Sequence, residues 1–329
     1  RSTHCISSAA SDVYKRQQTK SAVSYKNPVV DIAMPDPTVI KAADGYFYVY
    51  ATESTRNVPI MKSKDLVEWT YCNTAFTNKT RPRFEPKAGI WAPDINYING
   101  KYVLYYAMSV WGGEQTCGIG VATANSPQGP FTDHGKMFRS NEIGVQNSID
   151  PSLLQYEGRN YLVWGSFRGI YVIELTTDGL SIMPGAKKKR IAGTAFEAVY
   201  IHKHDDYYYM FASIGSCCQG VKSTYKVVVG RSKKVWGPYK DKTGKPMLKN
   251  GYSLVIGAND HFVGNGHGSQ IIRDDAGQDW LLYHGFSRST PENGRILLLD
   301  QIKWDQEGWP YVEGGSPSYE TQKAPVFNN

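Results

Sequence analysis

Long hydrophobic runs are absent from this sequence. No stretch of about 18 consecutive apolar residues occurs, and that is the length a transmembrane helix needs. Segments of useful length with helical periodicity are also missing between the apolar, strand-like runs. We therefore expect neither a membrane partner nor a helical architecture.

Cysteine is scarce. The five cysteines stand at positions 5, 72, 117, 217 and 218, and no C-x-x-C pair occurs. This pattern argues against zinc ribbons and thioredoxin-type chemistry. The adjacent residues Cys217 and Cys218 cannot easily bond to each other, so we expect buried free thiols. Cysteine usage does not assign a compartment.

A concentrated charge of one sign is also missing. The 37 basic and 30 acidic residues leave a formal net charge of +7 in 329 residues, and the positive charges are scattered. The one dense basic run, Lys187–Arg190, comes shortly after Pro184 and Gly185 and is interpreted as a solvated turn. We expect no nucleic-acid partner. Hydrophobic residues make up 41% of the chain, which is typical of a globular protein.

Residues 1–17 differ from the rest of the chain. They contain no signal-peptide pattern, because no apolar stretch follows Arg1. Codons for Ser7 to Gln17 (SSAASDVYKRQ) can be chosen that reproduce a transposase sequencing adapter. We interpret residues 1–17 as translated adapter and not native protein, which removes Cys5 from consideration. On that interpretation the native N-terminus is missing, and the lack of a signal peptide says nothing about export.

One pattern recurs five times: a carboxylate often beside proline, an apolar strand, a tight turn with Gly or Asp, and an aromatic strand. The copies are DPTVIKAADGYFYVYA from Asp36, PDINYINGKYVLYYA from Pro93, DPSLLQYEGRNYLVWG from Asp150, EAVYIHKHDDYYYMFA from Glu197 and GSQIIRDDAGQDWLLYH from Gly268. In several copies two more strand-like runs follow, such as IGVATA with GPFTD and KVVVGRS with GPYKD. Four strands in each of five units predict an all-β fold, a five-bladed β-propeller with four-stranded blades around a central channel. We assign the propeller to residues 28–320, with tails at 18–27 and 321–329.

The repeat also aligns carboxylates. In a propeller the first strand of each blade lines the channel, and four units begin with an acid: Asp36, Asp94, Asp150 and Glu197. Such aligned acids indicate a catalytic cluster or a cation site. Glycoside hydrolysis needs one group to protonate the leaving oxygen and another on the opposite side of the bond, and a third acid close by raises the pKa of the first. For Asp94 we favour a structural role in the turn.

Several motifs resemble glycoside hydrolase family 43, and within it the arabinanases. They are DPTVI at Asp36, GIWAPDI at Gly89, IGVATA at Ile119, NSIDPSLL at Asn147, GSF at Gly165, FEAVYI at Phe196 and the long block from Cys217 to Leu248. The resemblance extends from about residue 27 to residue 312. It implies an inverting glycosidase in which Asp36 is the general base, Glu197 the general acid and Asp150 the residue that modulates the pKa of the acid.

The resemblance also implies further site residues. His267, in GNGHGSQ, matches a histidine at the channel centre that holds a calcium ion or a similar cation such as sodium, mostly through water; the chemistry itself needs no cofactor. Trp91, Trp111, Asn147 and Ser166 match residues that contact or surround the sugar. The expected substrates are arabinan and arabino-oligosaccharides. A monomer in a secreted or periplasmic bacterial location is expected from such a substrate.

Three phrases depart from the arabinanase pattern. Pro35 stands where arabinanases have histidine, Arg168 replaces the tryptophan of GSFWGG and is expected to bind substrate, and GHGS replaces GHNS. An exo-acting α-L-arabinofuranosidase or a β-xylosidase of the same family is therefore the alternative. The fructan-cleaving propellers are disfavoured because their W-x-N-D-P-N phrase is absent. A non-catalytic carbohydrate-binding propeller is disfavoured because all three acids are present.

Overall fold

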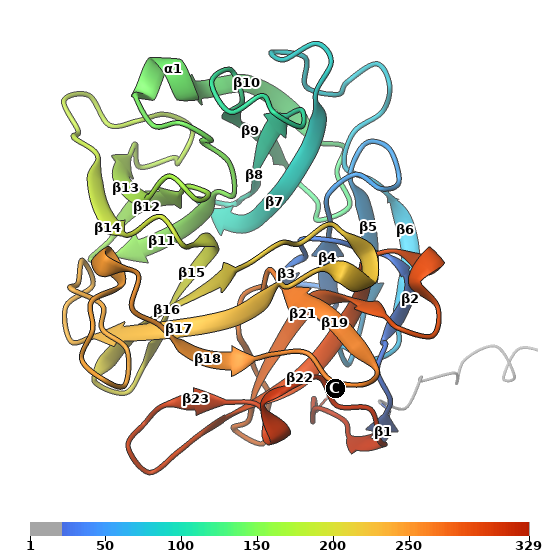
Figure 1. Cartoon of the computed structure of the whole chain (residues 1–329). Coiled ribbons are helices and arrows are strands. Elements are labelled where there is room, and N and C mark those ends of the chain that lie inside the picture. Colours follow the sequence, from blue (N-terminus) through green and yellow to red (C-terminus); the bar gives the residue numbers. More distant parts are fainter. Residues whose placement is uncertain (1–21, 329) are drawn as a thin grey trace, which may run out of the picture.

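The computed structural model describes residues 22–328, and these residues form five principal antiparallel sheets around one axis (Figure 1). The predicted all-β, five-bladed propeller with four-stranded blades is confirmed. Helical structure within the described part is limited to short pieces: α1 (Ser140–Ile143), η2 (Gly220–Lys222), η3 (Met247–Lys249), η4 (Pro291–Asn293) and η5 (Glu313–Gly315). No helix in residues 22–328 is long and apolar enough to cross a membrane.

The first four blades each use four consecutive strands. Blade 1 contains β3 (Thr38–Lys41), β4 (Phe47–Tyr50), β5 (Pro59–Ser63) and β6 (Thr70–Thr74). Blade 2 contains β7 (Gly89–Ile98), β8 (Lys101–Ser109), β9 (Gly118–Ala124) and β10 (Thr132–Arg139). Blade 3 contains β11 (Ser152–Tyr156), β12 (Arg159–Trp164), β13 (Ile170–Leu175) and β14 (Lys189–Ala192). Blade 4 contains β15 (Glu197–His204), β16 (Tyr207–Ile214), β17 (Lys226–Ser232) and β18 (Ser253–Ile256).

The fifth blade closes the ring. Its strands are β19 (Phe262–Gly266), β20 (Ile272–Arg273), β21 (Asp279–Ser287), β22 (Ile296–Trp304), β23 (Pro310–Tyr311) and β2 (Val30–Ala33). The outer strand β2 comes from the beginning of the described chain and pairs with β22. Strand β1 (Ser24–Tyr25) pairs with β24 (Gln322–Lys323), so the described parts of the two predicted tails pack together. The predicted adapter segment, residues 1–17, lies outside the described residues.

Two strand predictions were wrong in detail. The outer strand of blade 4 is β18 and not GPYKD, because Lys240 of that run forms only isolated bridges to Arg231 and Pro246. The inner strand of blade 5 is divided: β19 precedes the predicted unit, and only β20 falls within it. His267 lies between these two pieces, where the chain leaves the sheet.

Aromatic and β-branched residues build the strands and the junctions between blades. The run Phe47–Tyr50 (FYVY) favours a strand and is completely buried, and the preceding turn ends at Gly45, whose φ of 83° suits glycine. Five large apolar clusters fill the five blade junctions. At the first junction Tyr48 of blade 1 packs with Leu104 and Tyr106 of blade 2. Each such side chain contributes about 1.5–3 kcal/mol when fully buried.

One left-handed residue stands at the start of the inner strand of every blade. These residues are Asp36, Ala92, Asp150, Ala198 and His267, with φ between 42° and 56°. A non-glycine residue in this conformation is uncommon and is concentrated at functional sites. The structural counterpart of Asp36 in blade 2 is therefore Ala92, and Asp94 lies two residues further along the strand.

The expectation for the adjacent cysteines was wrong. Cys217 and Cys218 form a disulfide with each other in the loop between β16 and η2. Both residues are partly exposed. Among the described residues, Cys72 and Cys117 are free thiols. Adjacency in the sequence therefore does not prevent these two cysteines from bonding to each other.

Candidate active site

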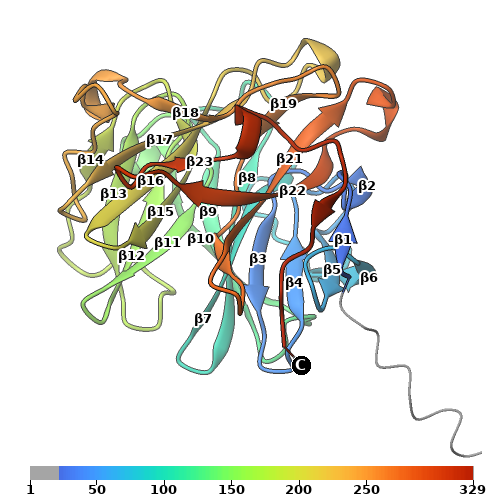
Figure 2. The ribbon, with the colours of Figure 1, turned by 90° about the horizontal axis from the view of Figure 1, so that it is seen from below.

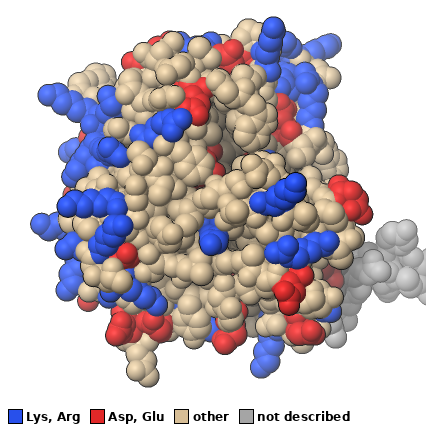
Figure 3. All heavy atoms as spheres, viewed as in Figure 1, with Lys and Arg blue, Asp and Glu red and all other residues tan. Residues whose placement is uncertain are grey.

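The inner strands place the predicted acids at one end of the channel. In side view the strands run between two faces of a short cylinder, with connecting loops on both (Figure 2). The face seen in Figure 1 has a hollow near its middle with acidic atoms at its edge (Figure 3). Asp36, Asp150 and Glu197 are all buried, at 8%, 7% and 8% exposure. Sequence repetition thus brings these three acids into one region.

Asp36 is held as a carboxylate. The Thr52 hydroxyl donates a hydrogen bond to its Oδ2 at 2.6 Å, and Arg295 Nη1 donates to its Oδ1 at 2.9 Å. His267 Nδ1 lies 3.1 Å from the same Oδ1. Burial acts to raise the pKa of Asp36, but the charges of Arg295 and His267 outweigh it and hold that pKa well below its usual range.

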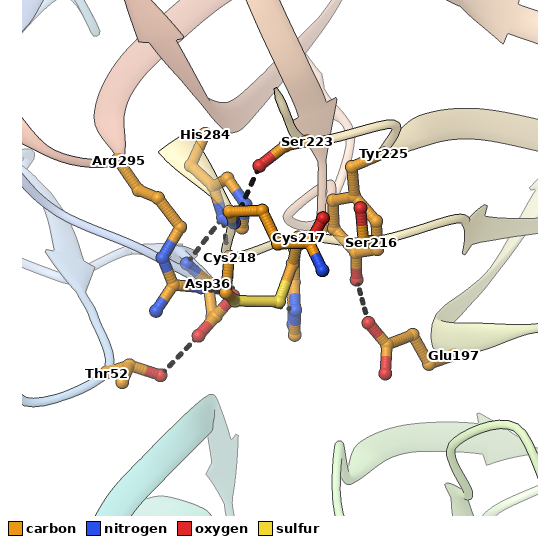
Figure 4. Close-up of a disulfide and its surroundings, with 12 residues drawn as sticks. Asp36, Thr52, Glu197, Ser216, Cys217, Cys218, Ser223, Tyr225, His284 and Arg295 are labelled. Atoms are coloured by element: carbon orange, nitrogen blue, oxygen red, sulfur yellow. Dashed lines mark hydrogen bonds and ion pairs between the residues drawn. A yellow bond between two sulfur atoms is a disulfide. The ribbon is translucent and has the colours of Figure 1, made fainter. Parts of the chain in front are cut away.

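Glu197 has a different environment. Ser166 Oγ donates to its Oε2 at 2.6 Å, and the Tyr225 hydroxyl donates to its Oε1 at 2.5 Å (Figure 4). Burial raises the pKa of Glu197, although these two hydrogen bonds act in the opposite direction. The charge of His267 also lowers the pKa of Glu197, but this effect does not outweigh burial. Glu197 therefore retains a proton more readily than Asp36.

Asp150 is coupled to Glu197. Its Oδ2 accepts the amide of Ala198, the residue after Glu197, at 3.2 Å. Burial and the charge of Glu197 raise the pKa of Asp150 to about 8. Because each carboxylate disfavours ionisation of the other, the two groups titrate as a pair that holds a proton near neutral pH.

His267 lies among the three predicted acids. Burial acts to lower its pKa, but Asp36, Asp150 and Glu197 together raise it to about 9. Its backbone N–H donates to Ser213 Oγ at 2.9 Å, which fixes the loop between β19 and β20. The ring borders a central cavity of about 20 Å³. Other polar groups around this cavity are Thr38, Asp94, Asp150, Ser152, Ser269 and Gln270.

Asp94 has structural contacts. Its Oδ2 accepts the backbone amide of Leu153 at 2.8 Å, and its Oδ1 accepts Gln270 Nε2 at 2.8 Å. These bonds connect blade 2 to blades 3 and 5. Burial raises the pKa of Asp94 to about 7. The contacts agree with a structural role, although they join whole blades rather than a turn.

The predicted aromatic residues lie together. The Trp91 and Trp111 rings are 5.5 Å apart between centroids, with 51° between their planes. Trp91 is on β7, and Trp111 follows β8 with 78% of its surface exposed. An exposed indole beside a second one provides an apolar surface that a sugar ring can cover.

Two of the predicted polar residues, Asn147 and Ser166, lie deep in the site. Arg168 lies near its rim. Asn147 Nδ2 donates to Ser166 Oγ at 3.0 Å, and this hydroxyl in turn donates to Glu197. Arg168 lies further out and is 44% exposed at its side chain, where it pairs with Glu114 at 2.8 Å. Ser166 therefore contacts the proposed acid directly, whereas Arg168 belongs to the rim between blades 3 and 2.

Four residues that contact Asp36 or Glu197 were not predicted from the sequence: Thr52, Tyr225, His284 and Arg295. The Asp36 amide donates to His284 Nδ1 at 3.0 Å, and burial lowers the pKa of this histidine to about 4. Tyr225 lies within the long block from Cys217 that carried the resemblance, and His284 ends the fifth repeat, so both had a weak signal. Arg295 had none. Figure 4 shows the disulfide among Asp36, Glu197, Tyr225 and Arg295.

Comparisons with known proteins show similarity to arabinan-degrading enzymes. The chain is 37% identical over 290 residues to extracellular endo-α-(1→5)-L-arabinanase 1 of Bacillus subtilis, covering 84% of this chain and 86% of the relative. It is 36% identical over 307 residues to the extracellular exo-α-(1→5)-L-arabinofuranosidase ArbA of Cellvibrio japonicus, with the same coverage of 84% and 86%.

Solved structures show the same likeness. The Cellvibrio cellulosa α-L-arabinanase complexed with arabinohexaose superposes with a TM-score of 0.79 at 33% identity, over 88% of this chain and 98% of that one. The endo-arabinanase from Bacillus licheniformis gives a TM-score of 0.74 at 32% identity, over 88% of this chain and all of that one, 100%. A family model described as glycosyl hydrolases family 43 matches residues 25–310. The chain belongs to glycoside hydrolase family 43.

Proposed function

We propose that the chain cleaves α-1,5-linked L-arabinofuranosyl bonds of arabinan with inversion of configuration. Asp36 is the general base that activates water, Glu197 is the general acid that protonates the leaving oxygen, and Asp150 raises the pKa of that acid. The observation that supports this assignment is the difference in contacts: Arg295 and His267 lie against Asp36, whereas two hydroxyls donate to Glu197. Two cationic groups hold Asp36 ionised, whereas Asp150 and Glu197 keep a proton between them.

An ionised Asp36 and a protonated carboxyl at Glu197 are what an inverting hydrolase needs. One carboxyl must be protonated and the other ionised at the same pH, on opposite sides of the scissile bond. Because Asp150 and Glu197 disfavour each other's ionisation, loss of the proton that they share is costlier, and the hydroxyls of Ser166 and Tyr225 hold the Glu197 carboxyl in a fixed orientation. Trp91 and Trp111 supply the apolar surface for arabinosyl units.

Chromatography of early products tests the substrate and the mode of attack. Linear arabinan, debranched arabinan and xylan are digested with the purified chain, and the products are separated at low conversion. An endo-acting arabinanase releases oligosaccharides of mixed length from both arabinans and nothing from xylan. Release of xylose from xylan without release from arabinan would contradict the proposal.

An exo-acting α-L-arabinofuranosidase is the second candidate. Pro35 and Arg168 both depart from the arabinanase phrases, and the Arg168–Glu114 pair lies at the rim of the site. An exo-acting enzyme releases a single short product from the earliest time points. Inversion is tested separately by proton NMR of the first product, which carries the β-anomeric configuration if the proposal is correct.

The central cavity fits a calcium-like cation. Apart from the His267 imidazole, the polar groups that line it offer mainly oxygen atoms, which are the ligands calcium prefers. Asp94, Asp150 and His267 would surround such an ion, and its charge would favour the ionised forms of the acids. Chelation is expected to lower the Tm or the activity, and added calcium is expected to restore it. If a strong chelator changes neither the Tm nor the activity, the proposed cation site is contradicted.

The substrate also suggests where the chain works. Two relatives are described as extracellular, and we propose a secreted or periplasmic location for this one. Arabinan and arabino-oligosaccharides are the proposed partners, and a monomer is the proposed state. Light scattering coupled to gel filtration tests the monomer: a mass near twice 36.8 kDa would contradict it.

A further inference from the structure

A second group of ligand-type side chains lies at the opposite end of the blade 4 inner strand. His202 and His204 are on β15, and Asp279 begins β21 of blade 5. Side chains two positions apart on a strand face the same side, so the two imidazoles lie together. One ligand atom from each of the three residues lies within 4.8 Å of the others. His204 is seven positions after Glu197 on β15, about 23 Å along the strand at about 3.3 Å per residue.

The neighbours of this group already orient it. His204 Nδ1 lies 3.8 Å from Asp279 Oδ2, while its Nε2 lies 3.5 Å from the carboxylate of Asp205. Imidazoles that bind metals commonly donate a hydrogen bond from their second ring nitrogen to a carboxylate, and Asp205 is placed to become that acceptor. Trp304 Nε1 donates to Asp279 Oδ2 at 2.8 Å, and its ring stacks on that of His204 at 3.7 Å and 4°. Both the ring and the carboxylate are thereby fixed.

We propose that His202, His204 and Asp279 bind a zinc ion at the junction of blades 4 and 5. Two imidazole nitrogens and one carboxylate oxygen form a ligand set that zinc accepts, with water in the fourth position. Calcium and magnesium prefer oxygen ligands and do not match this set. The inference is independent of the hydrolase activity and concerns a site remote from the predicted acids.

Zinc binding requires a small contraction of the group. In a tetrahedral shell with bonds of about 2.0–2.1 Å, ligand atoms lie about 3.4 Å apart. The atoms here lie up to 4.8 Å apart, so the ion draws β15 and β21 together. Arg273 Nη1 lies 3.4 Å from Asp279 Oδ1, and its side chain is 61% exposed. This cation competes with the zinc ion and can move into solvent when the ion binds.

The experiment uses the whole chain without a polyhistidine tag, freed of metal by chelation and dialysis. Zinc chloride is titrated by calorimetry, and the Tm is recorded with and without zinc. We expect one zinc per chain and a rise in Tm of about 2–5 °C at zinc concentrations about 100 times the Kd. His202→Ala is expected to weaken zinc binding at least about 10-fold, judging by the effect of altering groups around metal sites. His261→Ala, a matched change at a ring that stacks on Tyr319, leaves binding unchanged.

A second variant keeps the test decisive if His202→Ala folds poorly. Arg273→Gln removes the competing cation without touching a ligand, and it is expected to tighten zinc binding. Stoichiometric zinc that binds equally well to wild type, His202→Ala and Arg273→Gln would place the ion elsewhere and overturn the proposal. Absence of saturable zinc binding to the wild-type chain would do the same. A calcium response that persists in His202→Ala belongs to the channel and does not count as support.

Discussion

Asp36 and Asp150 occupy the same place in two blades and yet have opposite ionisation. Each precedes a proline, each has a left-handed backbone, with φ of 53° and 56°, and each is buried to a similar extent. His267 acts on both acids, but Arg295 acts on Asp36, whereas Glu197 acts on Asp150. The repeat therefore supplies position, and the neighbours that each acid meets decide its chemistry. Changing those neighbours is the way to test the difference.

Among changes to the neighbours of the two aspartates, removal of the Arg295 charge is expected to have the largest effect. Arg295→Gln takes away the cation 2.9 Å from Asp36, so the pKa of that carboxyl rises. Since the base works only when ionised, the acidic limb of the kcat/KM profile moves to higher pH. Losing a charged hydrogen bond of about 1.5–3 kcal/mol lowers activity about 10- to 100-fold. Arg288→Gln, which removes a guanidinium bonded to the Asn259 carbonyl, is the matched control.

The position of the acidic limb of the kcat/KM profile tests this prediction. If Arg295→Gln loses activity with no displacement of the limb, the arginine binds substrate and does not set the ionisation of Asp36.

Asp150 is expected to make the fold less stable as the pH rises. Its pKa in the folded chain is about 8, above the unfolded value of 3.8, so the folded state binds more protons between these values. His267, with a folded pKa of about 9 against 6.5, acts in the same direction and loses its contribution as the pH rises through 9. With a chelator present to keep the channel free of cations, the Tm of the wild type should therefore fall between pH 6 and pH 9.

Asp150→Asn removes one of these titrations and reduces the positive charge on His267. Its Tm should change less over the same pH range, measured by scanning calorimetry. The exposed Asp260→Asn serves as control and should follow the wild type. A pH dependence that is identical in wild type and Asp150→Asn would show that this carboxyl is not the group that titrates.

The smallest effect is expected at the rim. Arg168→Trp replaces a guanidinium with a flat aromatic ring, and it should shift the length distribution of products from linear arabinan without abolishing cleavage. The lost ion pair to Glu114 is exposed, so the stability cost is about 0–1 kcal/mol. Glu114→Gln breaks the same ion pair without adding a ring. It therefore separates the effect of the lost ion pair from the effect of the added aromatic ring. An unchanged product profile in Arg168→Trp would place this residue outside the subsites.

The sequence predicted what repetition and local pattern determine. Hairpin turns, aromatic strands and the strand-start acids led to the propeller and to Asp36, Asp150 and Glu197. Arg295 escaped because nothing local marks it: it reaches Asp36 across 259 positions of sequence, through the closure of the ring between blades 5 and 1. The Cys217–Cys218 bond escaped because it depends on loop backbone conformation. Asp94 was wrongly paired with Asp36 in the repeat. The residue of blade 2 that corresponds to Asp36 is Ala92, which has no carboxyl group to mark the position.

The central claim is that Asp36 is the general base and Glu197 the general acid. Comparing substrates with different leaving groups tests this claim most directly. A sugar oxygen needs the proton of Glu197 to depart, whereas a nitrophenolate needs it far less. Glu197→Gln should lose about 10²–10⁴-fold on arabinan, but much less on a nitrophenyl arabinofuranoside, and its alkaline limb should disappear. Asp36→Asn should be severely impaired on both substrates, because water must be activated in either case. Equal losses for both variants on both substrates would contradict the assignment of base and acid.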